Sequence, residues 1–414
     1  MDEGDTQTVP VDNTYREVFL LHNREFQRYA VENGVHFSPV DDVSAPSFDR
    51  ETSRSDDDLV SKQEEIERLQ YMHGMFNLMF ENRLIFPPIP RPRRILECGS
   101  GSGGWAAQVA EQYPECEVGG SFLWAPFVFP NAPRWRDITI SNQVLLQRYC
   151  YPDMVDWKRA PSETVEKQEP GSCVIGIDIF PYMVAEDMPA NLEFQVDDLN
   201  SPFTFQSNYF DLVHSRMMAG GINTNRWPSY MTDILRVLRP GGWCQMVEIY
   251  FNAQSDNGTL TANHALQVWS QNYMQSVSAY KDPRAPMRLE NWMRQAGFVE
   301  VEARLLTLPL TGWSNDPRDN AIGTANRANV HRLLSSLALY PFTQALGMTN
   351  NEVQLLVAQA RAEADNPAYR AYFPVYVCIG RKPGGSRSSR PDSYRSQTPS
   401  KSGRHSDSRK RVRR

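Results

Sequence analysis

Four glycines follow the first apolar segment that the sequence predicts to be a β-strand. Gly99, Gly101 and Gly104 satisfy the G-x-G-x-x-G pattern of a dinucleotide-binding loop. Gly99, Gly101 and Gly103 satisfy the G-x-G-x-G pattern of a loop that binds S-adenosylmethionine (SAM). Both loops need glycine because the backbone turns sharply and a ligand approaches with no Cβ in the way. A glycine-rich turn without a ligand satisfies the same patterns, so the motif alone does not identify a site.

Acidic side chains at three predicted strand ends distinguish between the two cofactors. Glu97 lies two residues before the first glycine, where a carboxylate attracts the cationic amino group of SAM and repels a pyrophosphate. Asp178 ends the second strand and can accept hydrogen bonds from both ribose hydroxyls. Asp197 and Asp198 end the third strand, where a carboxylate can accept from the adenine amine; the alternative is that they only cap a loop. We predict that SAM is bound by Glu97, Gly99, Gly101, Gly103, Asp178, Asp197 and Asp198.

Residues at the ends of later elements are candidates for the acceptor side. His214 and Arg216, at the end of the fourth strand, are expected to border the acceptor pocket, or else to hold loop backbone. Tyr71 and His73, on an earlier helix, either close over the cofactor or pack on the sheet, and Glu248 either faces the cleft or is a solvated carboxylate. SAM chemistry is an in-line displacement that depends on proximity and orientation, so no catalytic base is assigned. No Asp/Asn-Pro-Pro-Tyr/Phe motif follows the fourth strand, which argues against methylation of nucleic-acid amines.

Apolar segments predict the elements that position these residues. Strands are expected at 95–98, 174–178, 192–196, 210–214, 243–249, 298–308 and 373–381. Helices are expected at 59–84, 105–113, 230–238, 325–339 and 351–364, with the methionines of the first of them packed in the core. Strands that alternate with helices indicate a parallel sheet covered on both faces.

Together these segments resemble the class I SAM-dependent methyltransferases. The resemblance is carried by ECGSGSG (97–103), GID (176–178), VDDLNSPF (196–203), FDLVHSR (210–216) and LRPGGWCQMVE (238–248). FDLVHSR, RWPSY (226–230) and LRPGGWCQMVEIYF are similar to the fungal LaeA-like methyltransferases, regulators associated with secondary metabolism. The likeness spans about residues 59–383, apart from one gap.

The resemblance implies a fold, a cofactor and partners. The expected fold is α/β, with a Rossmann-like seven-stranded, mostly parallel sheet in the order 3-2-1-4-5-7-6. Strand 7 is antiparallel, helices cover both faces, and a helical cap precedes the sheet. The implied function is SAM-dependent methyl transfer to a protein or small metabolite, with nuclear regulation and velvet-type protein partners. The alternative is a weakly active or inactive SAM-fold regulatory module that acts through partners; an NAD-dependent oxidoreductase is supported only by the overlap of the two glycine patterns.

One interruption departs from the family pattern. The ribose acid is expected about 20 residues after the glycine loop, but Asp178 lies much farther from Gly103. Removing about 119–173 restores the expected spacing. The segment is either a loop insertion over the site or a retained intron, and we favour the intron because the segment interrupts a strand rather than extending a turn.

Composition and charge indicate where the domains begin and end. The 414 residues are 41% hydrophobic, enough for a substantial core, and no segment is long and apolar enough to span a membrane. Residues 1–58 are acidic and expected to be mostly disordered, with a possible short helix at 15–29. A cap helix at 59–92 and a methyltransferase domain at 93–380 should follow, and then a disordered basic tail at 381–414.

The charge distribution and the cysteines suggest where the protein acts. The tail is strongly basic although the net charge of the chain is −6, so nucleic-acid binding is expected only through the tail. Its final cluster, from Ser408 to Arg414, is typical of a nuclear import signal, or else it is a solvated end. The six cysteines show neither a C-x-x-C motif nor zinc-ligand spacing. We therefore expect a reduced intracellular protein, nuclear or nucleocytoplasmic, without a structural metal.

Overall fold

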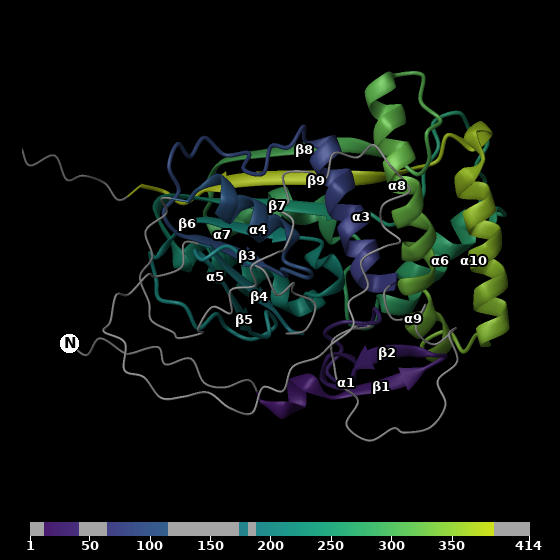
Figure 1. Cartoon of the computed structure of the whole chain (residues 1–414), viewed down its shortest axis with the longest axis horizontal. Coiled ribbons are helices and arrows are strands. Elements are labelled where there is room, and N and C mark those ends of the chain that lie inside the picture. Colours follow the sequence, from purple (N-terminus) through teal and green to yellow (C-terminus); the bar gives the residue numbers. More distant parts are fainter. Residues whose placement is uncertain (1–11, 41–63, 115–173, 181–187, 385–414) are drawn as a thin grey trace, which may run out of the picture. The chain divides into compact units, whose positions relative to one another are not determined.

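The computed structural model describes residues 12–40, 64–114, 174–180 and 188–384 (Figure 1). The predicted insertion at about 119–173 and nearly all of the predicted basic tail lie outside the described residues. The intron and import-signal hypotheses, and the predicted domain boundaries, therefore stay predictions.

A seven-stranded sheet forms the centre of the described chain. Its strands are β3 (Ile95–Cys98), β4 (Val174–Asp178), β5 (Leu192–Val196), β6 (Phe210–Arg216), β7 (Leu238–Ile249), β8 (Val299–Pro309) and β9 (Tyr372–Arg381). They lie in the order β5-β4-β3-β6-β7-β9-β8. The five strands from β5 to β7 pair in parallel, and β9 runs antiparallel to both β7 and β8. The predicted order and the antiparallel seventh strand are confirmed.

Helices cover both faces of the central strands. On one face, α4 (Gly104–Gln112) packs over Ile95 and Leu212. On the other, α5 (Trp227–Val237) and α7 (Leu289–Ala296) pack in the cluster that contains Leu96 and Val213. Because side chains alternate between the faces of a strand, neighbouring residues of β3 and β6 enter different clusters. Burial on both faces explains why Ile95, Leu96 and Cys98 of β3 are all apolar.

A group of helices lies beside one end of the sheet (Figure 1). It consists of α3 (Glu64–Met79), α6 (Ala265–Val277), α8 (Pro317–Ser336), α9 (Leu339–Gln344) and α10 (Asn350–Asp365). One hydrophobic cluster joins these helices to the ends of β7 and β9. It includes Met72, Met75 and Met79, which confirms that these methionines pack in the core.

The start of α8 shows which local signal the periodicity missed. The helix begins at Pro317, before the predicted residue 325. The Asp316 side chain accepts hydrogen bonds from the backbone N–H groups of Arg318 and Asp319, and proline occupies the first turn. An acidic N-cap followed by proline is a strong helix start signal, although this first turn has little apolar periodicity.

Residues 12–40 differ from the prediction of a mostly disordered segment with a short helix at 15–29. They form η1 (Asn13–Arg16), an antiparallel hairpin of β1 (Val18–Leu21) and β2 (Arg24–Gln27), and α1 (Arg28–Glu32). His22 and Asn23 have φ angles of 50° and 63°, as a two-residue hairpin turn requires.

Distant contacts explain why this segment folds despite its acidic composition. Phe26 is fully buried, and its ring centre lies 5.5 Å from that of Tyr340 in α9. Phe37 stacks on the same tyrosine at 5.7 Å. The few apolar side chains of residues 12–40 thus bury against distant helices, a contact that local composition does not reveal.

Gly323 marks a close approach between α8 and the chain after β8. A Cβ at this position would lie 2.1 Å from the carbonyl oxygen of Thr311, which is backbone and cannot rotate away. Gly323→Ala is therefore expected to lower the free energy of unfolding by about 1–3 kcal/mol, measured as a lower thermal midpoint. Gly74→Ala in α3, with nothing within 4 Å of the new Cβ, should instead raise stability by up to about 1 kcal/mol. Equal midpoints for the two variants would contradict this packing.

Candidate functional site

A cavity of about 170 Å³ lies at the carboxyl-terminal edge of the parallel strands. Its walls come from the glycine loop, the ends of β4 and β6, the segment after β5, one face of α3, and residues 35–40. Ligands of open α/β sheets bind at this edge, where the strand order reverses. Of the predicted site residues, the structure brings Gly99, Gly101, Asp178, Asp197 and Arg216 into these walls.

The glycine loop has the backbone conformation that its sequence predicts. Gly99, Gly101 and Gly103 have φ angles of 75°, 54° and 75°, in the left-handed region. A Cβ on Gly103 would also lie 2.7 Å from the ring of Phe194. Gly103 is the N-cap of α4, so the loop delivers the chain directly into that helix. Gly103 itself lies behind the cavity wall and shapes the loop from there.

Asp178 holds the glycine loop in place. One carboxyl oxygen accepts a hydrogen bond from the backbone N–H of Gly101 at 2.8 Å, and the other accepts from Phe180 N–H at 3.2 Å. Burial raises the pKa of Asp178, and these backbone donors oppose that change. The side chain therefore connects the end of β4 to the loop after β3 at the edge of the cavity.

Glu97 is buried at the end of β3 without a partner. The side chain is 0% exposed, and neither carboxyl oxygen has a hydrogen-bond partner among the described residues. Burial raises its pKa to about 8, although the nearby guanidinium of Arg216 opposes this shift. A buried polar group without a partner is costly, so this carboxyl group is suited to a cation. The ammonium group of SAM fits this requirement.

Arg216 and His73 place positive charge and an N–H donor on the same side of the cavity. The Arg216 guanidinium lies 5.3 Å from the centre of the Phe76 ring, and burial lowers its pKa while Glu97 raises it. His73 Nε2 lies 3.3 Å from the amide nitrogen of Asn77, which can only donate, so Nδ1 carries the proton. Nδ1 is buried without a partner among the described residues. Both groups face the cavity as donors to an anion.

The two acids after β5 have different surroundings. Asp197 lines the cavity, and burial raises its pKa. Asp198 lies outside the wall, where one oxygen accepts from Asn200 N–H at 2.9 Å and the other from the Tyr29 hydroxyl at 3.3 Å. The loop-cap alternative therefore describes Asp198, and direct cofactor contact is supported only for Asp197.

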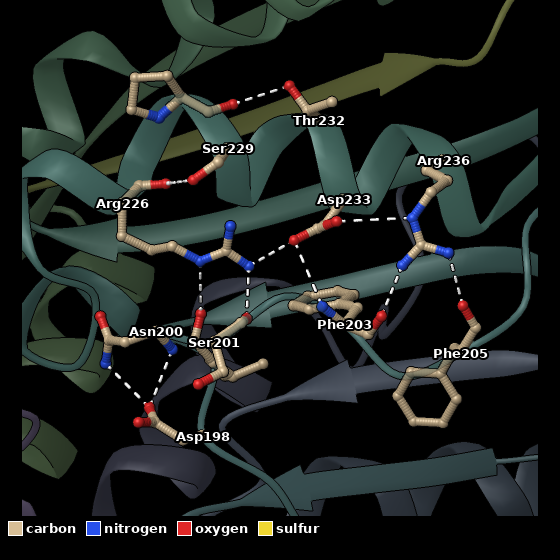
Figure 2. A network of polar contacts seen from close by, with 12 residues as sticks. Asp198, Asn200, Ser201, Phe203, Phe205, Arg226, Ser229, Thr232, Asp233 and Arg236 are labelled. Carbon is tan, nitrogen blue, oxygen red and sulfur yellow. Dashed lines mark hydrogen bonds and ion pairs between the residues drawn. The ribbon is translucent and has the colours of Figure 1, made fainter. Parts of the chain in front are cut away.

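An arginine network fixes the segment after β5 on α5 (Figure 2). Arg226 donates to the carbonyl oxygens of Leu199 and Ser201 at 3.0 and 2.7 Å, and it pairs with Asp233. Arg236 donates to the carbonyls of Phe203 and Phe205 at 2.7 and 2.6 Å. None of these three residues lines the cavity. Because these guanidinium groups bind the backbone carbonyls of four alternate residues between 199 and 205, they hold the loop that follows Asp197 in one conformation.

His214 does not border the cavity, and that prediction is wrong. Its ring stacks on Trp105 with centres 3.9 Å apart, and Nδ1 lies 3.2 Å from Gln245 Nε2. The side chain is 1% exposed, and burial keeps its pKa well below the usual value. His214 and Arg216 share one face of β6, but His214 lies one pleat deeper under α4.

Glu248 and Tyr71 also differ from their predicted roles. Glu248 is buried, and its two carboxyl oxygens accept from Met218 and Ala219 N–H at 2.7 and 3.0 Å. It therefore fixes the turn after β6 and faces neither solvent nor the cavity. Tyr71 is 38% exposed and lies under the guanidinium of Arg332, so it does not close over the cofactor.

Several wall residues have no equivalent in the sequence prediction. His36 and Phe37 come from the segment expected to be disordered, and Lys281 follows α6. Arg68 and Glu65 form a buried ion pair at 2.7 Å on α3. Charges three residues apart on the apolar face of a predicted helix were an available signal for this pair. No local signal marked the others.

Within the described ranges, no helix is long and apolar enough to cross a membrane, and no cluster of three or more His, Cys, Asp or Glu side chains suits a metal ion. Cys98, Cys244 and Cys378 are buried free thiols. Burial raises the pKa of each of these thiols, so they are inert rather than nucleophilic.

Comparisons with known proteins show the family of the chain. A methyltransferase domain model matches residues 71–303, more than half of the chain. The secondary metabolism regulator laeA of Monascus pilosus is 24% identical over 379 residues, which cover 90% of this chain and 81% of that protein. The protein-methionine methyltransferase laeA of Emericella nidulans is 26% identical over 325 residues, 78% of this chain and 71% of that protein. A solved phosphoethanolamine N-methyltransferase of Haemonchus contortus is 18% identical with a TM-score of 0.41, over 81% of this chain and 61% of that one. The chain belongs to the methyltransferase-domain family and is a SAM-dependent methyltransferase.

Proposed function

We propose that the described cavity holds SAM with its amino-acid group toward β3 and β6. Glu97, which is fully buried and does not itself line the cavity, would accept from the ammonium group, while the wall residues Arg216 and His73 would bind the carboxylate. Asp178 would accept from the ribose hydroxyls and Asp197 from the adenine amine. Bound SAM supplies a methyl group made electrophilic by its sulfonium. The protein supplies orientation and exclusion of water, which are sufficient for an in-line displacement.

We propose a small metabolite as the methyl acceptor. The observation that carries this proposal is the small cavity of about 170 Å³ whose walls include residues 35–40 together with the glycine loop. Phe37, Phe251 and Leu337 add apolar surface to the walls. An enclosed pocket with apolar walls and a few polar groups is typical of small-molecule sites.

The location of transferred label tests the acceptor class. The full chain is incubated with methyl-tritiated SAM and separate metabolite and protein fractions of a fungal extract. Label in the metabolite fraction supports the proposal. Label only in protein would favour a protein acceptor, the second candidate, because the Emericella relative is named a protein-methionine methyltransferase. No transfer, with S-adenosylhomocysteine (SAH) still bound, would favour the inactive regulatory module.

We further propose that the protein regulates secondary metabolism in the nucleus with velvet-type partners. The support is that the Monascus relative is named a secondary metabolism regulator, together with the basic composition of residues 381–414. A fluorescent fusion of the full chain should concentrate in nuclei, and removal of residues 401–414 should abolish this. Nuclear signal that survives the truncation would contradict an import signal in the tail.

A further inference from the structure

We infer that residues 12–40 form a cover that closes the SAM cavity, and that Lys281 is the positioning residue that holds this cover closed. The inference rests on contacts between the cover and several separate loops around the cavity mouth. It goes beyond the methyltransferase assignment, because it concerns how the cofactor enters and leaves.

The cover contributes directly to the cavity wall. Val35, His36, Phe37, Ser38 and Val40 all line it. The glycine loop and the end of β4 line the same cavity. A ligand bound along the glycine loop would therefore lie beside these residues of the cover. In the inferred opening, the cover moves away from the glycine loop and SAM enters between them.

Polar contacts join the cover to the sheet side of the cavity. Gln27 donates from Nε2 to the carbonyl oxygen of Ile179, after β4, at 2.9 Å. The Tyr29 hydroxyl donates to Asp198, after β5, at 3.3 Å. Both bonds are only partly buried, so water can replace them when the cover opens. The cover also packs Phe26 and Phe37 on Tyr340, so opening separates these rings as well.

Lys281 joins the cover to the loop after β6. Its ammonium group donates to three acceptors, the carbonyl oxygens of Val35 and Gly221, both at 2.8 Å, and Asn223 Oδ1 at 2.7 Å. The three donors of the ammonium are thereby fully used. Val35 and Gly221 both line the cavity. One side chain therefore joins the cover to the loop after β6 within the cavity wall.

The surroundings of Lys281 make its hydrogen bond to Val35 sensitive to any movement of the cover. The residue is 2% exposed, and all three of its acceptors are neutral. Burial lowers its pKa to about 7, with the more distant Asp198 opposing the shift. A buried cation without an adjacent carboxylate is retained only where its hydrogen bonds are complete. Opening the cover removes the Val35 acceptor and exposes the ammonium to water, which replaces the lost bond.

The experiment compares the rates of SAH exchange in two methionine variants of the full chain. Lys281→Met keeps most of the side-chain volume and removes all three bonds to the ammonium. Lys382→Met is the matched control, because Lys382 also donates to three neutral acceptors, at 2.7 to 3.1 Å, but contacts Asn208, Arg236 and Leu238 away from the cavity. Stopped-flow displacement of SAH measures the dissociation rate, and a thermal scan measures stability.

We expect Lys281→Met to raise both the association and the dissociation rate of SAH by about tenfold, about 1.4 kcal/mol in the opening equilibrium. Lys382→Met should change thermal stability by a similar amount but leave both rates unchanged. Lys281→Arg should restore slow exchange in part. Equal dissociation rates for Lys281→Met and Lys382→Met would overturn the inference.

A second variant keeps the test valid if Lys281→Met does not fold. Tyr29→Phe removes only the partly exposed hydrogen bond from the cover to Asp198 and should raise the SAH dissociation rate by about threefold. An unchanged rate in Tyr29→Phe would then overturn the inference. A wild-type protein that binds no SAH would instead contradict the cofactor site itself, so the two failures are distinguishable.

Discussion

Glu97→Gln is expected to weaken SAH binding by about 100-fold. The Glu97 carboxyl group is buried with no hydrogen-bond partner among the described residues, so the ammonium group of the ligand is the partner we assign to it. Removing one member of a buried charge pair costs about 2–5 kcal/mol, and about 1.4 kcal/mol corresponds to a tenfold change in affinity. Isothermal titration calorimetry measures the two affinities.

A second ligand serves as the control for Glu97. 5′-Methylthioadenosine has the adenosine and sulfur of SAH but lacks the amino-acid group. Its affinity should be the same for Glu97→Gln and the wild type, because Glu97 would contact only the missing group. Equal weakening of both ligands would show damage to the glycine loop and would contradict the assigned role.

The same residue predicts how affinity changes with pH. Burial raises the pKa of Glu97 to about 8 in the free protein, so the carboxyl group is mainly protonated at neutral pH. An ammonium group beside it favours the ionised form and lowers this pKa. Binding therefore releases a proton, and SAH affinity should rise as the pH increases toward about 8 and then level off. Calorimetry in buffers of different ionisation enthalpy measures the released proton, which Glu97→Gln should abolish.

The sheet was predictable from sequence for a physical reason. Strands covered on both faces carry apolar side chains toward both, and the three strands β3, β4 and β5 end at or are followed by glycine or acidic residues. Ile95–Cys98 is the clearest case, since all its residues are buried and Gly99 follows at once. The cavity residues that follow directly after strands, such as Asp178 and Asp197, were therefore also predictable.

The unpredicted parts of the site depend on how deeply a side chain is buried and on contacts between residues far apart in the sequence. His214 and Arg216 are indistinguishable by periodicity, but one pleat separates a ring stacked under Trp105 from a guanidinium in the cavity wall. The bond from Lys281 to Val35 joins positions far apart in the chain. Local patterns carry no information about such a contact. The role of residues 12–40 as a cover could therefore be inferred only from the structure.

Asp178→Ala is expected to lower SAH affinity by at least about 100-fold and to abolish methyl transfer. The ribose hydroxyls would lose a charged acceptor, and hydrogen bonds to charged groups contribute about 1.5–3 kcal/mol each. The Gly101 N–H would also lose its acceptor at 2.8 Å, which loosens the glycine loop. Calorimetry with SAH and a tritiated-methyl assay measure both effects.

Asp211→Ala is the matched control for Asp178→Ala. Asp211 is also buried, and one of its oxygens accepts from the backbone N–H groups of Arg93 and Arg94 at 2.6 and 2.9 Å, away from the cavity wall. Both variants should lower the thermal midpoint, because each leaves two backbone donors without a carboxylate. Only Asp178→Ala should lower SAH affinity. Comparable affinity losses in both would mean that Asp178 acts through stability alone, and the ribose contact would have to be assigned to another residue.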